Sequence, residues 1–136
     1  MKFSTTTSVL SALALIKQAT AFSAKGITYS PYTDSGDCKT AAEVASDLAQ
    51  ITEFDIIRLY GTDCSQVENV LAAKSSSQTI FQGLFYMAQI TADISAISAA
   101  IESTGSSCSD FSTISVGNEL ANDVEATVDH VAADIH

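Results

Sequence analysis

The sequence predicts an α/β fold in which four strand–helix units follow one another and form a parallel sheet. Four short runs rich in Ile, Phe, Tyr and Val alternate with four stretches whose apolar residues recur every three or four positions. The strand runs mostly lack polar alternation, as is typical of strands covered on both faces. Consecutive units of this kind favour parallel strands joined by right-handed crossovers.

The four predicted strands are short. They span residues 26–29 (GITY), 55–60 (DIIRLY), 79–86 (TIFQGLFY) and 113–116 (TISV). Two architectures accommodate four such units: a small doubly wound sheet, or the first half of a (β/α)₈ barrel. Chain length favours the open sheet, because a complete barrel needs about 250 residues.

Each predicted strand is followed by a stretch with the apolar spacing of a helix. Residues 40–43 (TAAE) and 65–68 (SQVE) match the capping box, 122–125 (NDVE) is close to it, and Gly105 predicts the end of the third helix. The apolar faces consist of Ala41, Val44, Ala45 and Leu48; Val67, Val70 and Leu71; Ile90, Ile94, Ile97 and Ile101; and Val124, Val128, Val131 and Ile135.

Side chains suited to a sugar site follow the predicted strands. In both architectures the working face lies at the carboxyl ends of the strands. Aromatic faces suit pyranose rings, and amide, guanidinium and carboxylate groups bond hydroxyls. The candidates are Tyr29 and Tyr32 after the first strand, Arg58 and Tyr60 in the second, Tyr86 at the end of the third, and Asn118 and Glu119 after the fourth.

Strand alternation adds directions to these candidates. If Glu119 points into a barrel, Ile114 and Val116 face the helix layer, and Arg58 and Tyr60 point inward on the second strand. Arg58 is the only arginine and lies in an apolar strand, so it needs a polar partner unless it reaches solvent at an edge. Glu119 also fits a simple helix-start acid favoured by the macrodipole.

Composition excludes several classes of function. The chain carries 6 Lys and Arg against 16 Asp and Glu, and such a surface repels nucleic acid and anionic lipid. The residues after the first strand, SPYTDSGD, are not a glycine-rich phosphate loop, and no Ser-His-Asp arrangement is visible. A neutral ligand such as a polysaccharide fits better, and we expect no cofactor and no metal.

Residues 1–21 predict a secretory signal. Lys2 precedes a short apolar run at 9–16, and 19–21 (ATA) fits the small-x-small cleavage pattern. The run is too short to span a bilayer, which needs about 20 residues, and we expect no other segment to cross a membrane. The remaining residues, 22–136, predict one domain that is secreted to the extracellular space or cell wall.

The segment from GITYSPYTDSGDC to RLYGTDCSQVENVL, followed by ISVGNEL, resembles the fungal branch of glycoside hydrolase family 17. These are secreted cell-wall β-1,3-glucanases and glucan transglycosylases. The resemblance implies a (β/α)₈ barrel, of which this chain would be the amino-terminal half, and a retaining two-carboxylate mechanism. It makes Glu119 the general acid/base and Asn118 the partner of the sugar 2-hydroxyl.

The sequence departs from the family where the second carboxylate is needed. In the family, the nucleophilic glutamate ends the seventh strand, and it has no counterpart among these 136 residues. We therefore expect the chain alone to be inactive. The alternatives are a non-catalytic wall protein that binds β-1,3-glucan through its aromatic residues, and a small-molecule binder on a doubly wound sheet.

The three cysteines predict one disulfide and one thiol, as expected in an oxidising compartment. There is no CxxC pair and no histidine at ligand spacing. Cys38 and Cys64 follow the first and second predicted strands at the same end of adjacent units. We favour this pair over any that includes Cys108, provided that the Cα atoms approach within about 7 Å.

Overall fold

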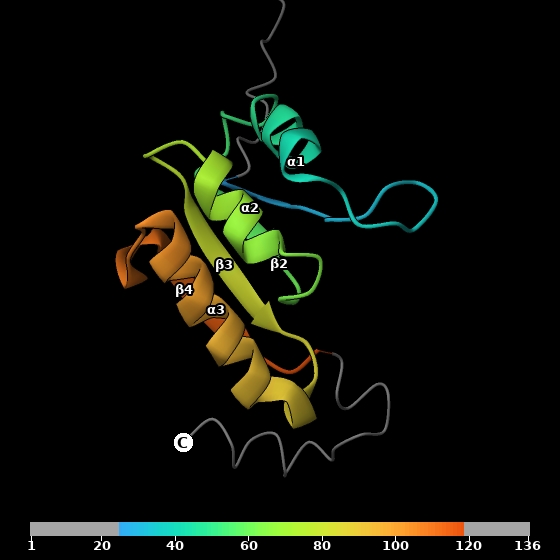
Figure 1. Ribbon diagram of the computed structural model, residues 1–136. Helices are drawn as coiled ribbons and strands as arrows, with labels where there is room; N and C mark the ends of the chain where they lie inside the picture. Colours follow the sequence, from blue (N-terminus) through green and yellow to red (C-terminus); the bar gives the residue numbers. More distant parts are fainter. Residues whose placement is uncertain (1–24, 119–136) are drawn as a thin grey trace, which may run out of the picture.

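The structure, a computed structural model, describes residues 25–118, which form a four-stranded parallel sheet with helices along one side (Figure 1). The predicted signal at 1–21 and the predicted helix after residue 122 lie outside the described residues. The elements are β1 (Gly26–Thr28), α1 (Ala41–Leu48), β2 (Ile56–Leu59), α2 (Gln66–Ala73), β3 (Thr79–Leu84), the 3₁₀ turn η1 (Met87–Gln89), α3 (Ile90–Thr104), the 3₁₀ turn η2 (Cys108–Asp110) and β4 (Phe111–Val116).

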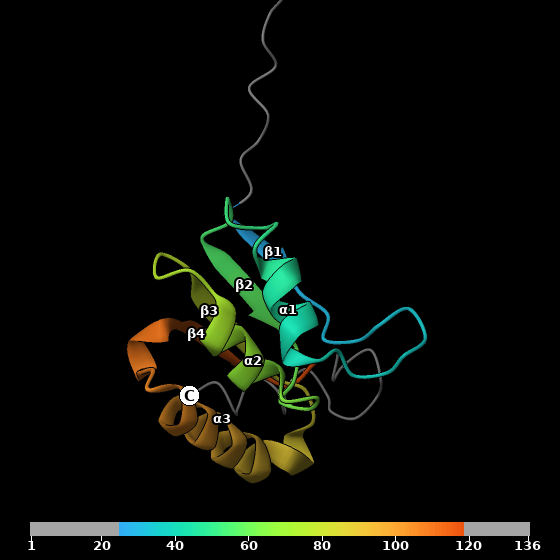
Figure 2. The ribbon, with the colours of Figure 1, turned by 45° about the horizontal axis from the view of Figure 1, so that its top comes forward.

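The order of the strands separates the two predicted architectures. The sheet order is β1-β2-β3-β4, identical to the order along the chain, and every neighbouring pair is parallel. Helices α1, α2 and α3 cover the same face, with α2 packed between the other two (Figure 2). A doubly wound sheet reverses its strand order and carries helices on both faces. The arrangement is therefore that of consecutive units of a (β/α)₈ barrel, and the doubly wound alternative is wrong.

The hydrophobic core lies between this sheet and the three helices. Ile57 and Leu59 of β2 and Ile80 of β3 are completely buried, and the register pairs Ile57 with Ile80. Burial of each such side chain contributes on the order of 1.5–3 kcal/mol. The helices contribute the facing residues Val44, Leu48, Val67, Val70, Leu71, Ile97 and Ala100.

The predicted start of α1 is present, but the predicted start of α2 is wrong. Thr40 and Glu43 form a reciprocal capping box, with the Glu43 carboxylate 2.7 Å from the Thr40 backbone nitrogen. Ser65 makes no side-chain cap, because it and Cys64 both have left-handed backbone conformations, with φ of 51° and 54°. Thr40 has an extended backbone, which lets its side chain reach the first turn of α1. The left-handed backbone of Ser65 directs its side chain away from the first turn of α2.

Helix α3 ends where the sequence predicts, but its buried face is rotated. Gly105 takes a φ of +67°, as a helix-ending glycine does. Ile94 is 53% exposed, whereas Asp93, Ile97 and Ala100 are buried. The predicted apolar stripe therefore had the wrong centre, since the buried arc passes through Asp93 and leaves Ile94 at its margin.

Strand β4 has the predicted alternation. Ile114 and Val116 pair in register with Gln82 and Leu84, whose side chains are buried, so they lie on the helix side of the sheet. Both remain about half exposed, and the helix predicted to follow them lies outside the described residues. Among residues 25–118, no helix combines the length and apolarity needed to cross a membrane.

Candidate functional site

A cleft of about 560 Å³ opens where strands β1, β2 and β3 end. Most of its wall comes from the three segments that connect each strand to the next helix, and Gln66 and Asp93 add the first turns of α2 and α3. The volume lies within the usual range for small-molecule sites. The cleft thus occupies the carboxyl rim, the position at which the sequence analysis places the site.

Three partly exposed tyrosines line this cleft, one from each connecting segment. Tyr32 follows β1, Tyr60 follows β2 and Tyr86 follows β3, with exposed fractions of 41%, 38% and 51%. The Tyr86 ring also packs edge-on against Phe85, at 4.8 Å between ring centroids. The structure therefore brings these three sequence candidates together, with ring surface left free for a ligand.

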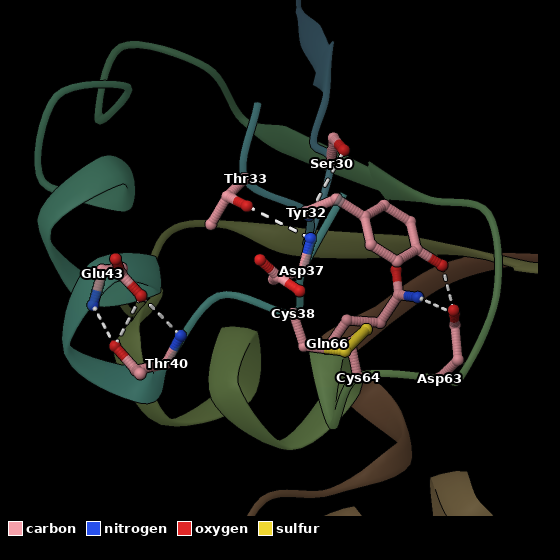
Figure 3. Close-up of a disulfide and its surroundings, with 10 residues drawn as sticks. All are labelled: Ser30, Tyr32, Thr33, Asp37, Cys38, Thr40, Glu43, Asp63, Cys64 and Gln66. Carbon is pink, nitrogen blue, oxygen red and sulfur yellow. Dashed lines mark hydrogen bonds between the residues drawn. A yellow bond between two sulfur atoms is a disulfide. The ribbon is translucent and has the colours of Figure 1, made fainter. Parts of the chain in front are cut away.

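Tyr32 is held in place by a bridging carboxylate. Its hydroxyl donates a hydrogen bond to Asp63 Oδ2, and Gln66 Nε2 donates to Asp63 Oδ1 at 2.7 Å (Figure 3). The bond to this carboxylate raises the pKa of Tyr32, because it stabilises the protonated hydroxyl. Asp63 therefore connects the first rim segment to the beginning of α2.

A disulfide joins the same two segments. Cys38 is bonded to Cys64, with 5.3 Å between their Cα atoms, and this is the pair that the sequence favours (Figure 3). Cys38 also forms an isolated antiparallel bridge with Tyr32, so the covalent tie reaches the backbone of that tyrosine. Cys108 is an exposed free thiol on η2.

Arg58 lies on the face of the sheet opposite the helices, as the alternation predicts, but its partners differ from the expectation. Its guanidinium carbon lies 4.4 Å from the centroid of the Tyr60 ring and 5.0 Å from that of Phe81. Its buried Nε has no hydrogen-bond partner within residues 25–118. Arg58 does not line the cleft, so among the described residues it acts on the cleft only through the ring of Tyr60.

Tyr29 is placed differently from the sequence expectation of a sugar-facing ring. It borders the cleft but is only 7% exposed and belongs to the hydrophobic core. Its hydroxyl donates to Asp47 of α1 at 2.9 Å, and burial raises its pKa above the ordinary tyrosine value. The physical reason is strand alternation: Tyr29 continues the direction of Ile27, toward the helices.

Asn118 follows β4 at the same rim, after a sharp turn. Gly117 takes a φ of +80°, which ends the extended conformation of β4, and its backbone nitrogen donates to the Leu84 carbonyl at 2.8 Å. Asn118 is half-buried, and Glu119 lies outside the described residues. The catalytic role of Glu119 and the sugar contact of Asn118 therefore stay predictions.

Asp93 and its hydrogen-bond donor Thr62 are polar residues of the cleft that the sequence does not identify as site candidates. Asp93, in the first turn of α3, is 7% exposed, and its Oδ1 accepts a hydrogen bond from Thr62 Oγ1 at 2.7 Å. A usable signal existed: Asp93 is three residues after Ile90 and four before Ile97, on the apolar side of the helix. A carboxylate on such a stripe indicates a buried polar contact.

The cleft is acidic. Its ionisable carboxylates are Asp63 and Asp93, and no Lys, Arg or His among the described residues lines it. Within the same residues, no group of His, Cys, Asp and Glu is arranged to hold a metal ion. Aromatic faces beside hydrogen-bond acceptors suit a neutral ligand that carries hydroxyl groups.

Comparison with known proteins decides the family. The model of the BtgE/BtgC glycoside hydrolase domain matches residues 26–136, which is most of the chain. The chain belongs to the BtgE/BtgC glycoside hydrolase domain family. The resemblance to glycoside hydrolase family 17 is also confirmed. A curated relative and a solved structure that match this chain, called the BtgE/BtgC-type chain below, are named as family 17 proteins.

Two yeast relatives define the extent of the match. The probable family 17 glucosidase SCW10 of Saccharomyces cerevisiae is 59% identical over 108 residues, covering 79% of this chain and 28% of the relative. The cell surface mannoprotein MP65 of Candida albicans is 54% identical over 110 residues, covering 81% and 29%. The BtgE/BtgC-type chain thus spans less than a third of the length of these relatives.

A solved structure supports the fold. The glycoside hydrolase family 17 β-1,3-glucanosyltransferase of Rhizomucor miehei matches with a TM-score of 0.61 at 18% identity, covering 76% of this chain and 40% of that one. An active-site mutant of the same enzyme, in complex with laminaritriose, matches equally well. The BtgE/BtgC-type chain therefore has a partial (β/α)₈ barrel fold.

Proposed function

We propose that this chain is part of a secreted retaining glycosidase that acts on the β-1,3-glucan of the fungal cell wall, by hydrolysis or by transglycosylation. One observation carries the proposal: Tyr32, Tyr60 and Tyr86 present partly exposed rings in a single cleft at the barrel rim. The family supplies the chemistry, and the laminaritriose complex of the Rhizomucor enzyme indicates the substrate class.

In this proposal the chain supplies the acid/base half of the reaction. Glu119 protonates the leaving glycosidic oxygen and then activates the incoming water or sugar hydroxyl, and Asn118 bonds the sugar 2-hydroxyl. A retaining mechanism also needs a carboxylate about 5–5.5 Å from the acid. Among the described residues, the carboxylates that line the cleft are Asp63 and Asp93, and neither lies at the end of a strand as the family's nucleophilic glutamate does, so we expect no turnover from the chain alone.

The location of the protein follows from the same reasoning. We propose that residues 1–21 are removed as a signal and that residues 22–136 function outside the cell, in the wall. The name of the Candida relative, a cell surface mannoprotein, supports this location.

A second function, glucan binding without catalysis, is favoured by a separate observation. Among the described residues, the cleft wall is assembled from residues 28–93 and does not include Asn118. A wall protein could therefore bind β-1,3-glucan through the tyrosines alone. If this second function is correct, Glu119→Gln leaves the affinity for glucan oligomers unchanged, and a full-length protein that contains this chain shows no turnover.

Calorimetric titration of the purified chain with laminaritriose tests the proposal. We expect binding, and a loss of affinity of at least about tenfold in Tyr60→Ala, because aromatic anchors carry much of the energy of such interfaces. Phe54→Ala is the matched control, since Phe54 precedes β2 at the opposite end of the sheet. Absence of binding, or equal losses in both variants, would contradict the proposed function.

A further inference from the structure

We propose that Asp93 is a specificity-determining residue that accepts hydrogen bonds from sugar hydroxyls in the cleft. This inference rests on the proposed function. It adds a substrate contact from the third strand–helix unit, whereas the catalytic assignment concerns the residues that follow β4.

The position of Asp93 is unusual for a carboxylate. It lies on the buried side of α3, is only 7% exposed, and still lines the cleft. Removing a carboxylate from water is unfavourable unless hydrogen bonds or a cation compensate. The ion pairs within residues 25–118 are Lys39–Asp47 and Lys74–Asp110, so neither of them compensates Asp93.

One oxygen of Asp93 is already engaged, which fixes the carboxylate. Oδ1 accepts from Thr62 Oγ1 at 2.7 Å, a bond that joins the segment after β2 to the first turn of α3. The described residues make no hydrogen bond to Oδ2. The carboxylate is therefore preorganised by Thr62 and keeps acceptor capacity for a donor that enters the cleft.

A second wall residue has the same deficit. Gln66 is 2% exposed and lines the cleft, and its amide nitrogen bonds to Asp63, but its Oε1 is buried without a partner. Gln66 Oε1 is buried in this structure, so a ligand in the cleft meets the acceptor of Asp93 beside the aromatic rings. Such a surface selects a neutral ligand rich in hydroxyl donors, and the negative charge of Asp63 and Asp93 disfavours phosphates and carboxylates.

Titration of Asp93→Asn with laminaritriose is the primary test. We expect the affinity to fall about ten- to a hundredfold, the range for losing a hydrogen bond to a charged group. Asp34→Asn is the matched control, because Asp34 makes the same charge change at an exposed position outside the cleft. Equal affinity of Asp93→Asn and the wild type would overturn the inference.

A set of laminaritriose analogues, each lacking one hydroxyl, separates contact from general damage. The wild type should lose affinity for the analogue that lacks the contacted hydroxyl, and Asp93→Asn should show no further loss with that analogue. If Asp93→Asn instead binds every analogue more weakly than the wild type by the same factor, Asp93 only stabilises the start of α3. That result would overturn the inference.

Thr62→Val is a second variant in case Asp93→Asn fails to fold. It removes the hydroxyl that orients Asp93 and leaves the carboxylate itself. We expect weaker binding with native circular dichroism, and unchanged affinity would argue against the proposed contact. If the wild type and Asp93→Asn bind equally well and Tyr60→Ala does not bind, this inference alone is refuted. If the wild type does not bind, the proposed function is refuted.

Discussion

Cys38 and Cys64 form a disulfide that ties together the two rim segments carrying Tyr32 and Asp63. The Cα atoms lie 5.3 Å apart, although the residues are separated by 26 positions in sequence. The covalent tie and the Tyr32–Asp63 hydrogen bond act on the same pair of segments. The first wall of the cleft is therefore fixed by both.

Removal of this disulfide should lower stability. For a loop of this length the chain-entropy model gives about 3 kcal/mol, so the double variant Cys38→Ser/Cys64→Ser should unfold at a clearly lower temperature. Cys108→Ser is the control, because Cys108 is free and exposed. Thermal unfolding followed by circular dichroism measures the difference, and equal midpoints in the two variants would mean that the tie does not stabilise the fold.

The bond between Tyr32 and Asp63 should matter for binding. Tyr32→Phe keeps the ring but loses the hydroxyl, so we expect a several-fold weaker affinity for laminaritriose, in the range for one hydrogen bond. Tyr29→Phe removes a hydroxyl that bonds to Asp47 instead. That variant should lose stability and keep its affinity, and the reverse pattern in the two titrations would show that the roles are exchanged.

Stability should fall in acid partly because of Asp47. Hydrogen bonds from Lys39 and Tyr29 hold the pKa of Asp47 below its ordinary value. A carboxyl whose pKa is lower in the folded state stabilises the fold above its unfolded pKa, about 3.9, and this contribution is lost as the pH falls through the folded pKa. In Asp47→Asn the free energy of unfolding should therefore fall less below about pH 4 than in the wild type. Denaturant titrations at pH 7 and pH 3 measure this fall, and an equal fall in both proteins would contradict the prediction.

The proposed role of Glu119 requires a protein that also contains a nucleophile. In such a full-length glycosidase, Glu119→Gln should reduce kcat on laminarin by about 10²–10⁴-fold, as expected for loss of a general acid/base. With aryl glucosides whose leaving groups are acidic, Glu119→Gln should slow the departure of the leaving group less, since these leaving groups need little protonation. Glu102→Gln, at an exposed position on α3, is the control, and near-normal activity of Glu119→Gln would refute the assignment.

Periodicity in the sequence was sufficient for the four strands and for the three helices within the described residues, because each element has its own apolar pattern. The strand order was beyond local periodicity, since neighbouring strands are chosen by packing across the whole sheet. Tyr29 was predicted to face the sugar because it lies at the end of the first strand. The alternation along that strand directs its side chain toward α1 instead. The position of Asp93 on an apolar stripe indicates a buried polar contact but not its partner, because the Thr62 hydroxyl comes from a segment 31 positions earlier.

The expected partner of Arg58 shows a further limit. A lone arginine in an apolar strand predicts a compensating group, and a carboxylate is the usual choice. The described residues instead place the aromatic rings of Tyr60 and Phe81 against the guanidinium. The alternation places Arg58 and Tyr60 on the same face, but it does not indicate Phe81, which lies on the neighbouring strand β3.

Nuclear magnetic resonance mapping of laminaritriose on the chain tests whether the glucan binds at the carboxyl ends of the strands. We expect chemical-shift changes concentrated at the carboxyl ends of β1, β2 and β3, at Tyr32, Tyr60, Tyr86 and the adjacent rim residues. Shifts concentrated at the opposite end of the sheet, around Phe54 and Gln78, or no shifts at saturating ligand, would contradict it.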